Sequence, residues 1–414
     1  MTDDSRRIAF DILKSVESEG AYSNILLNRR LERAQNADPA LVRRLVHGVL
    51  KNELLLDHQI ARFLKKPGLK TKQKILLRMG FYQLALCEDI PDYTAVDETV
   101  DLARKVSKGG EGFINAVLRS FVREGKEVRF PAYDPDDEDS FAAYLSVRYS
   151  CQPWIVRLWL DSYGKEKAQR LLQESLGTPP LSLRPNRLKA ESDRGFDISG
   201  GIAASADYRE GRFSVQDASA AEAMNALCAA KGETVLDMCA APGGKTCAMA
   251  ESMENEGSIL ACDIHEAKLQ LVEKEAKRLG ISIIRTTVRD AAEAPPAEEK
   301  GLYDAVLCDV PCSGLGVLRR KPEIKLHLKE EDAKALPALQ AQILRSAAEF
   351  TRPGGRLMYS TCTVNPAENE RVTQPFLEQG TFEKVCERQI FTGDPVGGSK
   401  GDGFYYCLMR KKIL

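Results

Sequence analysis

The stretch Thr234–Thr246, with the sequence TVLDMCAAPGGKT, constrains the fold of this chain more than any other segment. Its apolar start, Val235 and Leu236, is typical of a short buried strand. The chain then turns at Pro242-Gly243-Gly244 and runs into a good helix opening. A strand, a glycine turn and a helix form the first unit of a nucleotide-binding α/β fold. A glycine turn lets a ligand approach the backbone and aims helix N-terminal amides at it, although many other strand–helix corners also contain glycine.

Strands and helices alternate from residue 216 to the end of the chain. Apolar runs predict strands at 234–238, 258–263, 282–287, 304–308, 355–360 and 403–410. Helical patterns fill the gaps, and the helix at 267–279 ends at Gly280, a fitting C-cap. This alternation indicates a doubly wound, mainly parallel sheet, in which ligands bind beyond the carboxyl ends of the strands. We therefore expect residues 216–414 to form an α/β Rossmann-like domain.

Acids and cysteines follow five of these predicted strands. In chain order they are Cys239 and the glycine turn, Asp263, Asp290, Asp309 with Cys312, and Cys362. An acid after the second strand is placed to bind ribose hydroxyls, and one after the third to meet an adenine amino group. Any one of these residues could be a helix cap or a packed thiol. Their gathering at one edge of the sheet favours a single ligand crevice instead.

The glycine turn narrows the choice of ligand. The sequence CAAPGGK is not the G-x-G-x-x-G of a dinucleotide site. It also lacks the earlier glycine of a phosphate-binding G-x-x-x-x-G-K-[ST] loop. S-adenosyl-L-methionine has a ribose and an adenine but no phosphates, so a shorter turn suffices. We predict it as the cofactor.

Two cysteines point to the chemistry. The chain has eleven cysteines, none in metal-ligand spacing, so we expect no metal site. Carbon-5 of cytosine is a poor nucleophile until a thiolate adds at carbon-6, and the adduct must later lose the carbon-5 proton and the thiol. Cys312 and Cys362, at neighbouring strand ends, meet these needs. The alternative for either cysteine alone is a packed thiol.

The first part of the chain differs in character. Apolar residues at helix spacing and an absence of strand signals predict an all-α bundle of about seven helices over residues 6–125. Between Arg29 and Arg78 there are thirteen Lys/Arg and four Asp/Glu, which suggests a basic face or, alternatively, a solvated helix surface. The motifs YSN at 22–24, LVHGV at 45–49, TAVDE at 94–98 and FINAVLR at 113–119 resemble the NusB family of RNA-binding domains. This resemblance implies a NusB-like, RNA-binding domain over residues 1–130.

An acidic, proline-bearing stretch at 133–140 predicts a domain boundary, and a small α+β domain is expected over 141–215. The first residues contain acids and no long apolar core, and no apolar run reaches the ~20 residues that span a membrane. We therefore expect a cytoplasmic protein with no membrane partner. We also expect a monomer.

The motifs DMCAAPGGKT, DVPCSG and STCT, in this order and spacing, resemble the RNA 5-methylcytosine methyltransferases of the Sun family over residues 145–414. The resemblance implies that Cys362 is the nucleophile and that Cys312 assists product release. It also implies that 16S ribosomal RNA is the substrate, with transfer RNA as the alternative, and that the basic run Leu318–Glu323 contacts RNA phosphates. The cofactor-binding residues that it implies are Cys239, Ala240, Ala241, Pro242, Gly243, Gly244, Lys245, Asp263, Asp290 and Asp309, of which Lys245 and Asp309 would also polarise the cytosine.

Three rival functions remain at this stage. A DNA cytosine methyltransferase would use the cysteine of the Pro-Cys pair, so the roles of Cys312 and Cys362 would be exchanged. A non-catalytic assembly factor would keep the fold as an RNA-binding scaffold. An exocyclic-amine methyltransferase is disfavoured because the fourth strand ends in Asp309-Val310-Pro311-Cys312 and offers no aromatic residue to stack on the base.

Overall fold

The computed structural model describes residues 4–34, 36–66, 68–134, 136–189, 195–198 and 201–413. Met1–Asp3 of the chain start, Pro135 of the expected connector and parts of the expected 141–215 domain therefore lie outside the described residues. The chain forms two compact units. The first comprises Met1–Thr178 and Leu318–Leu328, and the second comprises Pro179–Val317 and Lys329–Leu414. No helix among the described residues is long and apolar enough to cross a membrane.

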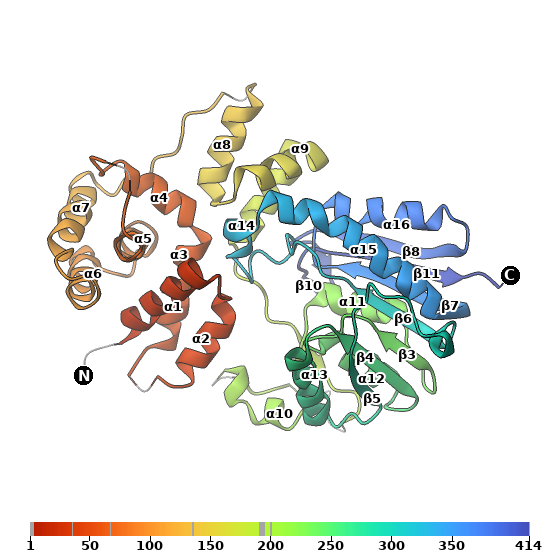
Figure 1. Ribbon diagram of the computed structural model, residues 1–414. Coiled ribbons are helices and arrows are strands. Elements are labelled where there is room, and N and C mark those ends of the chain that lie inside the picture. Colours follow the sequence, from red (N-terminus) through yellow and green to blue (C-terminus); the bar gives the residue numbers. More distant parts are fainter. Residues whose placement is uncertain are drawn as a thin grey trace. The chain divides into compact units, whose positions relative to one another are not determined.

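The first unit is helical, as predicted (Figure 1). Its apolar helix faces meet in one core that includes Phe81, Phe121 and Leu118. At the start of α3 the Asp38 carboxylate accepts a 2.8 Å hydrogen bond from the Ala40 amide and so caps the helix. The helices are α1 (Ser5–Glu19), α2 (Ser23–Leu31), α3 (Pro39–Lys51), α4 (Glu53–Ala61), α5 (Thr71–Leu86), α6 (Asp92–Val106), α7 (Glu111–Arg123), α8 (Glu138–Tyr149), α9 (Pro153–Leu176) and α14 (Ile324–His327).

Part of the positive charge of this unit is neutralised by ion pairs in its interior. Arg78 is only 2 % exposed, and its guanidinium lies 2.6–3.0 Å from carboxylates of Glu17, Glu53 and Asp57. A buried cation needs such partners, because an unpaired one would be strongly destabilising. The expected basic face therefore loses one of its charges to the core. Exposed arginines remain along α1 and α2, at Arg7, Arg29, Arg30 and Arg33.

The second unit contains a seven-stranded sheet with the strand order β5-β4-β3-β6-β7-β11-β8, in which β11 runs antiparallel to both neighbours (Figure 1). The order reverses between β3 and β6, so the carboxyl ends of these two strands mark the switch point where such sheets bind ligands. The doubly wound fold is confirmed. Its strands are β3 (Thr234–Asp237), β4 (Ser258–Asp263), β5 (Ile284–Val288), β6 (Tyr303–Asp309), β7 (Thr351–Thr361), β8 (Phe382–Ile390) and β11 (Phe404–Lys411).

Alternate residues of the central strands pack on opposite faces of the sheet. Val235, Leu307 and Met358 belong to one core, which includes residues of the helices α11 (Ala218–Leu227), α12 (Gly244–Ser252) and α13 (Glu266–Leu279). Leu236 and Tyr359 belong to the other, which includes residues of α15 (Glu330–Phe350) and α16 (Glu370–Leu377). Successive side chains of a strand point to opposite faces of the sheet, so each central strand contributes apolar side chains to both cores in turn.

One strand of the main sheet, β8, was not predicted from the sequence. Strand β8 lies at the edge of the sheet and its sequence FEKVCERQI is rich in charges, which protects an edge strand but hides its pattern. Strands β1 (Leu183–Pro185) and β2 (Phe213–Val215) pair antiparallel and belong to this unit, whereas α8 and α9 belong to the first. The separate domain over 141–215 therefore stays a prediction.

Candidate active site

The glycine turn follows β3 and is fixed by backbone hydrogen bonds. The Ala240 amide donates to the Cys262 carbonyl of β4 at 2.8 Å, and the Gly243 amide donates to the Ala240 carbonyl at 2.7 Å. Gly243 has φ 104°, and a Cβ there would meet the Cα of Val272 in α13 at 3.0 Å. Only glycine fits this conformation and this close approach. The turn therefore brings the start of α12 tightly against α13.

A cavity of about 530 Å³ opens at the carboxyl ends of β3, β4, β5 and β6. Of the ten predicted cofactor residues it is lined by five: Cys239, Ala241, Asp263, Asp290 and Asp309. The other five, Ala240, Pro242, Gly243, Gly244 and Lys245, are not among its lining residues. Ile264, Leu339 and Ile343 give it an apolar side.

The acids of this cavity are held by their own loops. One oxygen of Asp263 accepts the His265 amide at 2.9 Å, and one oxygen of Asp290 accepts the Ala292 amide at 2.9 Å. These local turns fix the direction of both carboxylates. The nearby Arg289 is engaged by Glu299 in two bonds of 2.6 and 2.7 Å. Three acids beside apolar groups suit a cationic ligand with ribose hydroxyls and an apolar base, and they disfavour one with phosphates. The residues present thus fit S-adenosyl-L-methionine.

Asp237, the last residue of β3, was not singled out in the sequence. It is 1 % exposed, and it accepts a 2.7 Å hydrogen bond from the Thr246 hydroxyl in the first turns of α12. Burial raises the pKa of Asp237 to about 7, against the opposing effect of the Thr246 hydrogen bond. A lone acid that ends an apolar strand is the signal that could have identified it.

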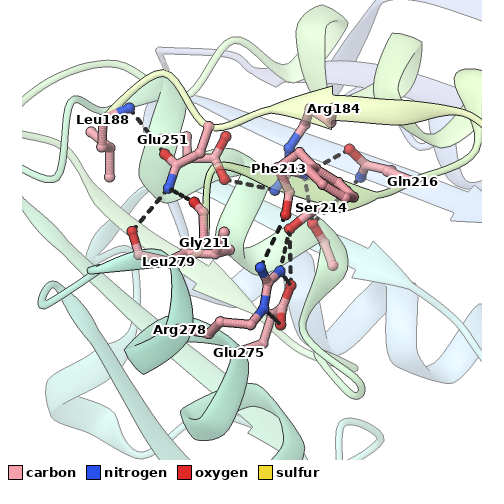
Figure 2. A network of polar contacts seen from close by, with 12 residues as sticks. Arg184, Leu188, Gly211, Phe213, Ser214, Gln216, Glu251, Glu275, Arg278 and Leu279 are labelled. Atoms are coloured by element: carbon pink, nitrogen blue, oxygen red, sulfur yellow. Dashed lines mark hydrogen bonds and ion pairs between the residues drawn. The ribbon is translucent and has the colours of Figure 1, made fainter. Parts of the chain in front are cut away.

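A second support of the turn comes from the paired strands β1 and β2 (Figure 2). Arg184 of β1 donates to the Gly244 carbonyl at 3.0 Å, to Gln216 at 2.7 Å and to the buried Glu251 of α12 at 2.8 Å. Arg278 of α13 holds β2, through the Phe213 carbonyl and the Ser214 hydroxyl, both at 3.0 Å. Arg184 therefore holds both the first residue and the last turn of α12, and no short sequence pattern marks it for this role.

Lys245, Asp309 and Ser360 form a chain across three neighbouring elements. The Lys245 ammonium lies 2.7 Å from one carboxylate oxygen of Asp309, and the Ser360 hydroxyl donates to the other at 2.8 Å. Burial lowers the pKa of Lys245, but the charge of Asp309 and their hydrogen bond, together with the Cys362 sulfur, leave it raised overall. Lys245 therefore stays an ammonium at neutral pH, close enough to Cys362 for their charges to interact.

Cys312 and Cys362 lie side by side. Cys312 follows β6 and Cys362 follows β7, and because these strands are parallel neighbours their ends meet. The two sulfurs are 3.3 Å apart and can share a proton. The hydrogen bond with Cys362, and then burial, raise the pKa of Cys312 well above its ordinary value. The pair can thus combine one thiolate with one thiol.

The basic run that follows Cys312 is not a solvated surface. Arg319 is 2 % exposed and Lys325 is fully buried, and the segment Leu318–Leu328 belongs to the first unit. Within that unit the Glu323 carboxylate accepts from the amide and the hydroxyl of Ser23 at 3.2 and 3.0 Å. The expectation that this run presents its charges to RNA phosphates is therefore wrong for Arg319.

Comparison with known proteins shows what the chain resembles. The family model described as 16S rRNA methyltransferase RsmB/F matches residues 224–409, and the NusB family model matches residues 3–123. Over 98 % of both chains, the protein is 35 % identical to a probable ribosomal RNA small subunit methyltransferase B of Bacillus subtilis. It is 32 % identical, again over 98 % of both chains, to the ribosomal RNA small subunit methyltransferase B of Escherichia coli.

Solved structures agree on the fold. A crystal structure described as PH0851 covers 99 % of this chain and all of its own, with a TM-score of 0.78 and 23 % identity. A methyltransferase homologue from Pyrococcus horikoshii covers 64 % of this chain and 97 % of its own, with a TM-score of 0.54 and 26 % identity.

Proposed function

This chain belongs to the family of ribosomal RNA small subunit methyltransferase B, and from this premise we propose that it transfers a methyl group from S-adenosyl-L-methionine to carbon-5 of a cytosine in 16S ribosomal RNA. The observation that carries the proposal is the pair of sulfurs 3.3 Å apart, beside the cavity at the switch point of the sheet. Carbon-5 needs a thiol that adds and leaves again, together with a group that takes its proton. A methyltransferase acting on an oxygen or an exocyclic amine needs no such pair.

Cys362 is the nucleophile in this proposal. Its thiolate adds to carbon-6 of the cytosine, so that a sulfur–carbon bond forms and ring electrons move toward carbon-5. When bound, S-adenosyl-L-methionine would supply an electrophilic methyl group to carbon-5, and the electron pair of the broken sulfur–methyl bond would stay on the cofactor's sulfur. A base then takes the carbon-5 proton, the double bond between carbon-5 and carbon-6 reforms, and the Cys362 sulfur leaves as a thiol with the proton that Cys312 donates to it.

Cys312 assists the release. Its raised pKa keeps it a thiol in the resting site, where it can share its proton with the Cys362 sulfur. The Lys245 ammonium favours negative charge on Cys362, since opposite charges at short range stabilise one another. We assign Lys245 and Asp309 the further task of polarising the cytosine ring.

The cofactor would be held by the loops after β3, β4, β5 and β6. Asp263 would bind the ribose hydroxyls, and Asp290 the adenine amino group. Asp309 and Cys239 line the same cavity, while Ala240, Pro242, Gly243 and Gly244 shape the turn beside it.

The NusB-like unit is the proposed RNA-binding part. Arg7, Arg29, Arg30 and Arg33 line a hollow of about 880 Å³ between α1 and α2, together with Asp4, Asp11 and Glu19. Exposed guanidinium groups form bidentate bonds with phosphates and supply sequence-independent affinity for RNA.

The test is the fate of the covalent adduct. Cys312→Ala should accumulate an RNA–protein adduct that survives a denaturing gel, whereas Cys362→Ala should form none. The opposite result would mean that the two cysteines exchange roles, as in a DNA cytosine methyltransferase. Calorimetry with S-adenosyl-L-methionine separates an enzyme from a scaffold, because an assembly factor without catalysis has no need to bind it.

The substrate is tested by bisulfite mapping of RNA from cells that lack the protein. Loss of one methylated cytosine in 16S ribosomal RNA is expected. Loss at a transfer RNA site alone would refute the ribosomal assignment.

A further inference from the structure

Glu368 is a fully buried acid to which the reaction above gives no task. It ends the short helix η3 (Pro366–Glu368), six residues after Cys362. Its carboxylate accepts three hydrogen bonds: from the Ser313 amide at 2.8 Å, from the Gln340 side chain at 3.0 Å and from the Asn365 side chain at 2.8 Å. Removing a carboxylate from water costs several kcal/mol, which only a set of well-placed donors offsets.

These donors come from the two loops that carry the cysteines and from α15. Ser313 directly follows Cys312, and Asn365 lies three residues after Cys362. Gln340 of α15 also donates to the carbonyl of Pro311 at 3.0 Å. The backbone on both sides of Cys312 is thus held, by Glu368 on one side and by Gln340 on the other.

Two further contacts join the same loops. The hydroxyl groups of Ser313 and Thr363, the residues that follow the two cysteines, are 2.7 Å apart. The Gly316 amide donates to the Cys362 carbonyl at 3.0 Å. Glu368 differs from these contacts because it carries a charge, and hydrogen bonds to a charged acceptor are about twice as strong as neutral ones.

We propose that Glu368 is a positioning residue, which fixes the Cys312 loop against the Cys362 loop so that the Cys312 sulfur stays within reach of the adduct. This inference rests on the proposed two-cysteine reaction and deepens it. The carboxylate also adds to the effects that raise the pKa of Cys312, behind the Cys362 hydrogen bond and burial. Glu368 therefore favours the protonated form of the thiol that assists release.

The variant Glu368→Gln tests this assignment. It keeps the size of the side chain but removes the charge, and its amide group must face a donor. We expect turnover to fall by about 100-fold, the scale of a misplaced reacting group. We also expect the RNA–protein adduct to accumulate as in Cys312→Ala, although Cys312 is present. The affinity for S-adenosyl-L-methionine should stay within twofold, because Glu368 does not line the cofactor cavity.

Asn369 provides the matched control. It is the next residue, it is equally buried, and it bonds to Thr361, Thr363 and Gln389 but not to the Cys312 loop. Asn369→Ala should lower the melting temperature without trapping the adduct. A purely structural role for Glu368 would make the two variants behave alike, and that result would overturn the inference.

The outcomes separate this inference from the proposed function. If Cys312→Ala traps the adduct and Glu368→Gln does not, only the role of Glu368 is lost. If Cys312→Ala traps none, the two-cysteine reaction itself is wrong. Should Glu368→Gln fail to bind S-adenosyl-L-methionine and so prove unfolded, Gln340→Leu decides, since it removes the links of Gln340 to Glu368 and to Pro311 and leaves the charge in place. If Gln340→Leu traps the RNA–protein adduct, the positioning role of Glu368 is supported. If it traps none, that role is refuted.

Discussion

Lys245 illustrates how one charge serves the site. Its ammonium pairs with Asp309 at 2.7 Å, and the Cys362 sulfur is one of the groups that raise its pKa. An ammonium beside a sulfur favours the thiolate, which is the reactive form of cysteine.

Replacing Lys245 by Met should therefore slow alkylation of Cys362 by iodoacetamide, by about tenfold at neutral pH. Mass spectrometry of the labelled peptide measures the rate at Cys362 alone. Cys312→Ala serves as the comparison that keeps Lys245. An unchanged alkylation rate in Lys245→Met would show that this charge does not activate Cys362, the proposed nucleophile.

Asp237 makes stability depend on pH. Its pKa is about 7 in the folded protein and about 4 in an unfolded chain, so the folded state binds more protons between these values. The contribution of Asp237 to stability is complete below pH 4, falls as the pH rises toward 7 and is lost above it. Asp237→Asn should remove this pH dependence, which changes the unfolding free energy by an amount on the order of a few kcal/mol between the two pKa values.

The measurement is urea unfolding of both proteins at pH 5 and pH 8. From pH 5 to pH 8 the parent should lose more unfolding free energy than the variant, because only the parent carries the titrating Asp237. Parallel curves would show that Asp237 titrates normally.

At the level of elements, the paired strands β1 and β2 contact both ends of α12 (Figure 2). Arg184 of β1 holds the Gly244 carbonyl and Glu251 at the two ends of α12, whereas Arg278 holds β2 without touching the glycine turn. The two arginines thus form a natural pair of test and control.

Arg184→Lys should weaken S-adenosyl-L-methionine binding by about tenfold, or ~1.4 kcal/mol, because lysine cannot reproduce the forked contacts. Arg278→Lys should lower the melting temperature and leave the affinity unchanged. Calorimetric titration and thermal unfolding separate the two effects. Equal loss of affinity in both variants would contradict a specific role of Arg184 at the turn.

For the whole molecule, the chain leaves the second unit after the Cys312 loop, enters the helical unit with the segment Leu318–Leu328 and then returns. The segment begins six residues after Cys312 and is built into the first unit. Lys325 is fully buried there and donates to the carbonyls of Lys51 at 2.9 Å and Tyr149 at 2.8 Å, while burial lowers its pKa to about 7. The catalytic domain therefore carries a segment whose partners lie in the other unit.

A fragment of residues 179–414 should for this reason aggregate, because it leaves the buried faces of Leu318 and Lys325 without their partners. Replacing 318–328 in that fragment by a glycine–serine linker of the same length should restore solubility. Light scattering of both fragments checks this. A soluble fragment with the native segment would show that its packing in the first unit is dispensable.

Local patterns account for much of the fold. The apolar runs predicted β3, β4, β6 and β11 to within a residue or two, because a strand that is buried on both faces consists of consecutive apolar residues. Strand β8 escaped because it is a charged edge strand. The placement of acids and cysteines after strands followed from the same patterns, since parallel strands end at one edge of the sheet.

The sequence by itself thus determined the two fold classes, the family and the edge of the sheet where the candidate site lies, because motifs and periodicity are short-range properties. The tertiary structure alone decided the rest: the 3.3 Å between two sulfurs fifty residues apart, the burial of Arg319 in the helical unit, and the donors around Glu368. In the stretch Thr234–Thr246, only the folded chain shows that the Gly244 carbonyl accepts a hydrogen bond from Arg184, which lies sixty residues earlier. Such contacts depend on which distant residues meet in space, and no local pattern encodes that.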